Sequence, residues 1–238
     1  MKIYVRGGLG MQVLELMVGL ALSIERKDVS NVEEVCVSIA GDVVQPVKLN
    51  YLKSVCDVGI PCNATNTQLK QNAWTRQNFE ILCKHYEEVI SRFKFLEPRI
   101  WKQYDNYFHI RGKDRKLISA EKYIDILKTE WIEKKKNACI LSDDKKFSRK
   151  IFDRFFSEHI DLMVNSEPVE DWFCLRNAKE VMGPFSTFTI SAWLTNPEQH
   201  LTILGPEYND KQYLDRKYYD LLELLFERIK GNGRIKSM

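Results

Sequence analysis

The sequence carries little excess charge, since 36 Lys and Arg residues stand against 33 Asp and Glu residues, a formal net charge of +3. Nucleic-acid-binding proteins usually show a clear basic excess, so charge gives no reason to expect a nucleic-acid partner. The chain also has only 11 Gly and 7 Pro among its 238 residues, which excludes fibrous and low-complexity classes. With 44% hydrophobic residues it can bury a real core as one large domain or two small ones.

Long hydrophobic runs are missing as well. The nearest candidate is the segment 13–24, which Glu15 interrupts and which is shorter than the ~18 apolar residues of a membrane span. Lys2 and Arg6 precede it, as in a signal peptide, but residues 2–5 read as a strand and no clean cleavage site follows. We therefore expect a cytoplasmic protein with no membrane span.

The six cysteines form no C-x-x-C pair, and none has a histidine at a zinc-ligand spacing. Their even number permits disulfides, but a chain of this length does not require them. Three of them lie in apolar segments, where a free thiol packs as a small hydrophobic group. We expect reduced core thiols and no metal site.

Strand-like and helix-like segments alternate through most of the chain. Strands are expected at 2–5, 35–39, 107–111, 138–141, 160–164, 180–182 and 201–204. Helices are expected from the Gly-rich turn to about 26, then at 74–93, 119–136, 147–156, 169–178, 187–194 and 213–229, with 41–67 irregular. This order predicts an α/β fold built from right-handed βαβ units, with parallel sheets in two Rossmann-like halves, residues 1–105 and 106–238.

In open parallel sheets, ligands bind outside the carboxyl ends of the strands. Four turns at the ends of expected strands are therefore candidate parts of a binding site: residues 7–10, 111–114, 142–144 and 183–187.

The first two turns suit phosphate. The glycines at 7–10 would let the backbone and a helix N-terminus approach an anion, although a tight turn with no ligand fits equally well. In 109–114, Arg111 offers a planar charged fork for two phosphate oxygens, and Lys113 could add a second positive charge. Asp114 could pair with either side chain and so fix its rotamer. The competing interpretation is a surface salt bridge at a strand end.

The other two turns carry carboxylates and hydroxyls. Asp143 and Asp144 could hold ribose hydroxyls or a metal, or they could be N-cap and first-turn acids of the next helix. Asp171, together with the hydroxyls of Ser186 and Thr187, suits a sugar or a phosphate, and the hydroxyls are equally ordinary helix caps.

Taken in order, these motifs resemble the α-1,2-fucosyltransferase family, which is related to the α-1,6- and protein O-fucosyltransferases. That family has G-G-L-G-N-Q near its start, H-x-R-R-G-D after mid-chain, S-D-D at a strand end and a later S-S/T-F-S-W-W-A-A-W-L stretch. The corresponding segments here are 7–12 (GGLGMQ), 109–114 (HIRGKD), 142–144 (SDD) and 186–194 (STFTISAWL).

The resemblance implies an inverting, metal-independent glycosyltransferase of GT-B type that moves fucose from GDP-fucose to a glycan hydroxyl, with an α-1,2 linkage to galactose. No cofactor or metal is required; the partners are the nucleotide sugar and an oligosaccharide acceptor. Residues 1–105 would be the acceptor-side half, and 106–238 would hold the nucleotide. Met11 and Gly112 depart from the family pattern. Two alternatives therefore stay open, a transferase using another nucleotide sugar and a degenerate inactive nucleotide- or glycan-binding module.

The resemblance also implies residue roles. Arg111 would bind the diphosphate and stabilise the leaving group, and His109 would lie beside the nucleotide. Asp143 would contact the ribose, Asp171 would read the guanine edge, and Ser186 and Thr187 would lie near the phosphates. The remaining donor-binding candidates are Gly8, Gly10, Gln12, Lys113 and Asp114. The general base is not identified, and Glu15, Asp28 and Asp42 stay unranked candidates.

Overall fold

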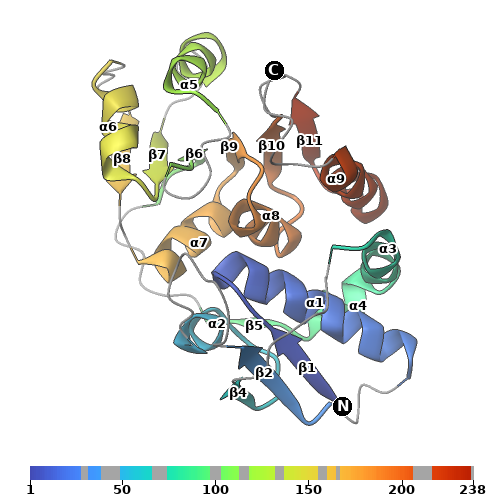
Figure 1. Ribbon diagram of the computed structural model, residues 1–238. Helices are drawn as coiled ribbons and strands as arrows, with labels where there is room; N and C mark the ends of the chain where they lie inside the picture. The colour runs from blue at the N-terminus through green and yellow to red at the C-terminus, as the bar shows by residue number, and fades with distance from the viewer. Residues whose placement is uncertain are drawn as a thin grey trace.

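The computed structural model describes residues 1–27, 32–38, 49–65, 74–96, 103–112, 118–131, 137–154, 160–164, 167–205 and 216–236. Two separate parallel sheets organise these residues (Figure 1). The smaller sheet has the order β1-β2-β4, with the bounds Lys2–Val5, Glu34–Ser38 and Cys62–Thr65. Its three strands are parallel, and a two-residue antiparallel pair, β3 (Cys56–Asp57) and β5 (Lys94–Phe95), stands apart from it.

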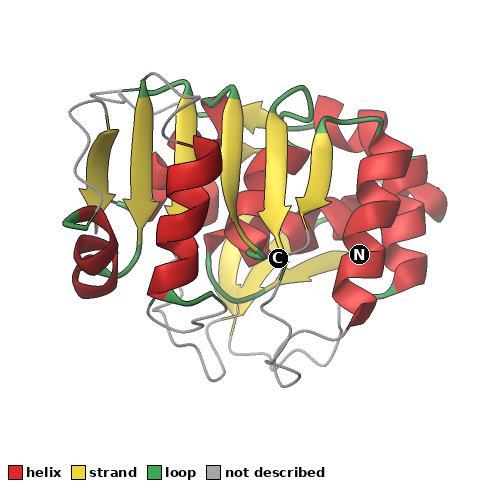
Figure 2. Cartoon of the chain, turned by 90° about the horizontal axis from the view of Figure 1, so that it is seen from above, coloured by secondary structure: helices red, strands yellow, loops and turns green. Residues whose placement is uncertain are grey.

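The larger sheet has six parallel strands in the order β11-β10-β9-β6-β7-β8. Their bounds are Gly233–Lys236, His200–Leu204, Glu180–Pro184, Asn106–Ile110, Ala138–Ser142 and Ile160–Val164. Figure 2 shows these strands running side by side, with their arrowheads at one edge. That edge is where the sequence predicted a site.

The helices cover the sheets and lie between them. In the first part of the chain they are α1 (Leu9–Glu25), α2 (Leu49–Val55), α3 (Arg76–Lys84) and α4 (Tyr86–Ser91). In the second part they are α5 (Ala120–Ile126), α6 (Lys145–Phe152), α7 (Pro168–Asn177), α8 (Thr187–Leu194) and α9 (Arg216–Ile229). Figure 1 shows α5 on one face of the larger sheet, with α7 and α8 on the face turned toward the smaller sheet.

The predicted fold class is confirmed: the chain is α/β, with two Rossmann-like parallel sheets. Strands of the smaller sheet come from residues 2–65 and strands of the larger sheet from 106–236. The division into two domains at 105/106 stays a prediction. No helix in the described residues is long and apolar enough to cross a membrane.

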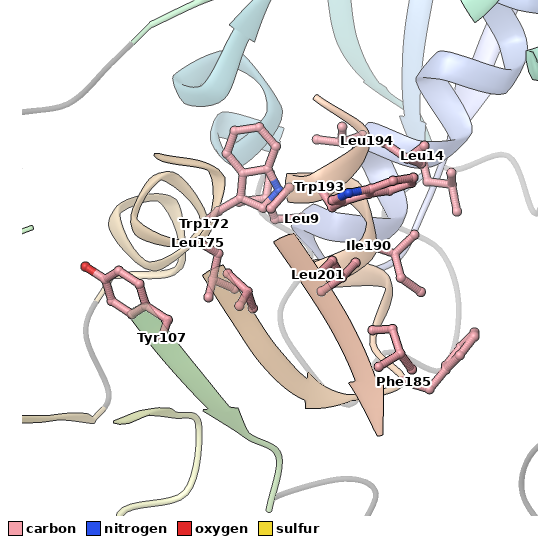
Figure 3. Close-up of a cluster of buried hydrophobic side chains, with 14 of the residues drawn as sticks. Leu9, Leu14, Tyr107, Trp172, Leu175, Phe185, Ile190, Trp193, Leu194 and Leu201 are labelled. Atoms are coloured by element: carbon pink, nitrogen blue, oxygen red, sulfur yellow. The ribbon is translucent and has the colours of Figure 1, made fainter. Parts of the chain in front are cut away.

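One continuous core joins the two halves. Leu9 and Leu14 of α1, Ile190 and Leu194 of α8 and Trp172 of α7 belong to one buried cluster, in which α1 packs on α8 (Figure 3). All five side chains are buried. Burying a large apolar side chain stabilises a protein by about 1.5–3 kcal/mol, so this contact holds α1 firmly against α8.

The middle of the first half was predicted incorrectly. Residues 49–65, expected to be irregular, form α2, β3 and β4. The side chains of β4 are half-buried or exposed, so the strand lacks the apolar alternation that marks a strand in a sequence. Its backbone pairing with β2 forms it instead.

Two expected helices are also interrupted. His85, at φ −110° and ψ 16°, ends α3 and precedes α4, so the segment 74–93 is not a single helix. The helix expected over 119–136 is α-helical to Ile126 and continues as a π-helical turn, η2 (Leu127–Trp131). Its N-cap is confirmed, because the Ser119 side chain accepts a hydrogen bond from the Lys122 N–H.

Candidate functional site

Three neighbouring strands of the larger sheet end side by side. In the register of β6 with β7, Ile110 lies opposite Ser142, and in that of β6 with β9, Phe108 lies opposite Met182. The turns after these strands, beginning at Arg111, Asp143 and Phe185, therefore share one edge of the sheet. The strand-end rule thus brings together three of the four turns that the sequence singled out.

Arg111 is the first residue after β6, and its guanidinium is tied to the start of α8. Its Nη1 donates a hydrogen bond to the Ser186 Oγ at 3.0 Å. Ser186 is the N-cap of α8, and its Oγ also accepts from the Phe188 N–H at 3.3 Å. The capping interpretation is therefore confirmed for Ser186, and its hydroxyl also holds the permanent positive charge of Arg111 at the helix N-terminus.

The two acids after β7 have different partners. The Gly112 N–H donates to Asp143 Oδ1 at 2.9 Å, so Asp143 fastens the turn that follows Arg111. Asp144 is the N-cap of α6, and its Oδ1 accepts from the Lys146 and Phe147 N–H groups at 3.0 Å each. The sequence left the cap open between the two acids; the structure gives it to Asp144.

These two contacts predict separate effects. Asp144→Ala should lower the free energy of unfolding by about 1 kcal/mol, because it removes the cap of α6, and should speed amide exchange at Lys146 and Phe147. Asp143→Ala should instead speed exchange at Gly112 and leave the α6 amides protected. Native-state hydrogen exchange measures both, and equal exchange patterns in the two variants would contradict the assignment.

His109 lies just inside the same edge. It is buried, and its Nδ1 is 2.8 Å from the Thr189 Oγ1 on α8. Gly183 on β9 allows this arrangement, because a Cβ there would lie 2.8 Å from the His109 carbonyl oxygen. The sequence indicated His109 but not Thr189, eighty residues away.

The Gly-rich turn between β1 and α1 meets the start of α8. Gly7 has φ +74°, which favours glycine, and Gly8 is the N-cap of α1. A Cβ on Gly10 would lie 2.4 Å from the Phe188 Cα and 2.6 Å from the Thr187 carbonyl carbon. Gly10 is therefore in contact with the backbone of α8, and the N-termini of α1 and α8 lie against each other.

A buried carboxyl group, that of Glu15, lies behind this turn and pairs with the partly exposed Arg6 side chain; sequence analysis left Glu15 as an unranked candidate for the general base. Glu15 on α1 is 7% exposed, and its Oε2 accepts from the Arg6 main-chain N–H at 2.6 Å. Its Oε1 accepts from the Arg6 Nε at 3.3 Å. Burial raises the pKa of Glu15 to about 7, against the opposing effect of Arg6.

The raised pKa makes stability depend on pH. Between pH 4.5 and about 7 the folded chain holds a proton on Glu15 that the unfolded chain has lost, so the unfolding free energy falls as pH rises. Each pKa unit is worth about 1.4 kcal/mol, so the full effect is about 3 kcal/mol. Glu15→Gln should remove this dependence in urea unfolding between pH 5 and 8. Glu80→Gln, at an exposed i,i+4 pair, is the control; parallel curves for wild type and Glu15→Gln would refute the effect.

These groups place positive charge at the junction of the two halves. A helix N-terminus acts as about half a positive charge, and two such ends meet beside the Arg111 guanidinium. Main-chain N–H groups and an arginine fork are the donors that phosphate oxygens prefer. The arrangement can bind a diphosphate and stabilise negative charge that grows on it.

The remaining predicted residues are placed as follows. Asp171 is buried in the first turn of α7, the helix that packs on α8, and Thr187 is the first residue of α8. Gln12 is fully buried and donates from Nε2 to the Gly7 carbonyl at 2.9 Å. Lys113, Asp114, Asp28 and Asp42 lie outside the described residues. Within the described stretches, no three His, Cys, Asp or Glu side chains converge as a metal site requires.

No protein-family model and no curated protein matches the sequence. Among solved structures, the chain is similar to a protein assigned as a UDP-N-acetylglucosamine 2-epimerase from Listeria monocytogenes, with 10% identity and a TM-score of 0.41 over 94% of this chain and 72% of that one. It is also similar to the UDP-GlcNAc 2-epimerase of Methanocaldococcus jannaschii, with 13% identity and a TM-score of 0.41 over 99% of this chain and 66% of that one. At this level of similarity neither structure identifies a substrate or a reaction for this chain.

Proposed function

We propose that this chain is a metal-independent glycosyltransferase that takes its sugar from a nucleoside diphosphate sugar, with GDP-fucose as the donor and a glycan hydroxyl as the acceptor. The observation that carries the proposal is the Arg111–Ser186 hydrogen bond at the N-terminus of α8, where the start of α1 also lies. GDP as the nucleotide and fucose as the sugar rest on the motif resemblance.

The chemistry follows from charge. When the bond between the sugar C1 and the diphosphate oxygen breaks, negative charge grows on the diphosphate and positive charge on the sugar ring. Arg111 is already held in place by Ser186, so it stabilises the leaving diphosphate without reorganising during the reaction. The main-chain N–H groups at the start of α8 add donors of the same polarity.

The neighbouring residues position this machinery. Asp143 holds the Gly112 N–H, which keeps the turn carrying Arg111 in one conformation. Thr189 holds the His109 ring beside the same strand end. In this proposal His109 and Asp143 contact the nucleoside, Asp171 reads the base, and Thr187 lies at the phosphates.

A thermal-shift titration with EDTA present tests the proposal. The ligands are GDP, GDP-fucose, GDP-mannose, UDP and UDP-glucose. A ligand that binds only the folded state stabilises it by about 2.7 kcal/mol at 100 times its Kd, which gives a clear shift. We expect shifts with the guanine nucleotides and release of GDP from GDP-fucose.

The other outcomes separate the alternatives. A shift with UDP compounds alone would keep the transferase and change the donor. Shifts with GDP but no turnover of any sugar nucleotide would indicate a binding module. No shift with any nucleotide would overturn the proposal.

A further inference from the structure

Three polar side chains, those of Arg6, Gln12 and Glu15, gather at the carboxyl end of β1. Gln12 and Glu15 are three residues apart, so they share one face of α1. Both reach back to the same turn: Gln12 Nε2 donates to the Gly7 carbonyl, and Glu15 accepts from the N–H and the Nε of Arg6. The cluster adjoins the turn through which Gly10 meets α8.

The oxygens of this cluster have capacity to accept more hydrogen bonds. Gln12 Oε1 is buried and accepts none from any described residue. Each carboxylate oxygen of Glu15 accepts one hydrogen bond from Arg6 and has a second lone pair. A buried acceptor without a donor costs about 1–3 kcal/mol, so such atoms suit a ligand that supplies the donors. Sugar hydroxyls are donors of this kind.

We propose that Glu15 is the general base of the transfer and takes the proton of the attacking acceptor hydroxyl, while Gln12 Oε1 accepts a hydrogen bond from a neighbouring hydroxyl of the same sugar. This inference rests on the proposed function and adds to it the residue that completes the reaction. The acceptor oxygen bonds to the donor C1, and the C1–O bond to the diphosphate breaks. The electron pair leaves with the diphosphate beside Arg111, and the acceptor proton passes to Glu15.

The electrostatics of the pair fit this role. A general base works best when its pKa lies near the working pH, and burial brings the pKa of Glu15 to about 7. Among the described residues, Arg6 is the charged group that acts on Glu15, and it holds that pKa down. No charged group of another described element packed on α1 adds to this effect.

Kinetics of GDP release from GDP-fucose test the assignment, with water or methyl β-galactoside as the acceptor. Glu15→Gln should lower kcat by about 10²–10⁴-fold and leave the GDP thermal shift unchanged, because the diphosphate side of the site is intact. The wild-type pH–rate profile should fall on its acidic side near pH 7, and Glu15→Gln should lose that limb. Glu80→Gln is the matched control on an exposed pair and should keep the wild-type profile.

Arg6→Ala provides a second measurement that does not depend on how Glu15→Gln folds. Arg6→Ala keeps the main-chain N–H that lowers the pKa of Glu15 most, but it removes the guanidinium charge and its hydrogen bond, which also lower that pKa. The acidic limb should therefore move to higher pH. A purely structural role for the pair would change the rate without moving the limb.

The failures are distinguishable. In the first case, the wild type binds GDP and releases it from GDP-fucose. If Glu15→Gln then keeps the wild-type rate, or if no acidic limb appears near pH 7, Glu15 is not the general base and the proposed function still stands. An unmoved limb in Arg6→Ala also overturns the base assignment. If the wild type binds no nucleotide, the proposed function falls with it.

Discussion

Replacing Arg111 with alanine is expected to reduce sugar transfer by about 10²–10³-fold, the usual cost of losing one preorganised donor to a developing negative charge. The loss should be in kcat/KM and should be accompanied by a weaker thermal shift with GDP. Arg111→Lys should recover only part of the rate, because an ammonium is a point charge and lacks the planar fork that holds Ser186 and a phosphate together. Steady-state GDP release measures these rates.

The fold should survive this change, because Arg111 lies at a strand end and is half-buried rather than in the core. Arg76→Ala is the matched control, since it removes the same charge from an exposed helical pair with Glu80. Full activity in Arg111→Ala, with the wild-type Tm, would remove Arg111 from the mechanism and leave its hydrogen bond as a structural contact only.

The second large effect is expected at Gly10, through packing rather than charge. An added methyl group would lie 2.4–2.6 Å from the Thr187 and Phe188 backbone, which cannot move as a side chain can. Overpacking of this kind costs about 1–3 kcal/mol, and Gly10→Ala should reach the upper end. It should also separate the two helix starts and weaken GDP binding. Urea unfolding and a GDP titration follow the two consequences.

Gly19→Ala on the same helix is the control. Its added methyl group would meet the buried Ile3 side chain, with Cγ2 at 2.5 Å, so this clash also costs stability but lies away from α8. Alanine favours the helix by about 1 kcal/mol over glycine, which offsets part of the cost at both positions. Gly19→Ala should therefore keep the wild-type affinity for GDP. If Gly10→Ala keeps that affinity too, or if both variants weaken GDP binding equally, the contact between α1 and α8 does not build the site.

The alternation of strand-like and helix-like segments predicted the architecture. Each buried parallel strand is marked by an apolar run in the sequence, and several helices by a residue that can cap the N-terminus. Thr187–Leu194 illustrates this, with a helix of the predicted bounds directly after a serine cap. Four strands, β3, β4, β5 and β11, were not predicted. β3 and β5 are two residues long, too short for any apolar alternation. β4 and β11 lie at the edges of their sheets and have partly exposed side chains, so pairing with the neighbouring strand forms them rather than a local apolar pattern.

The part of the candidate site that follows from the order of strands and turns was predictable from the sequence. The carboxyl-edge rule brings Arg111, Asp143 and Ser186 to one place without knowledge of any distance. It could not choose between Asp143 and Asp144 as the cap, since either acid at that spacing can serve. It also could not show that Glu15 turns back to Arg6, because the ionisation of a buried carboxyl depends on what surrounds it in three dimensions.

The joining of α1 to α8 also has a consequence for synthesis of the chain. Helix α1 is complete at residue 25, but the partner that covers Leu14 ends at residue 194. At about 5–20 residues per second, the ribosome needs about 10–30 s to make the intervening chain. During that interval the apolar face of α1 lacks its contact with α8. We therefore expect the first half to reach its native packing only after the second half has emerged.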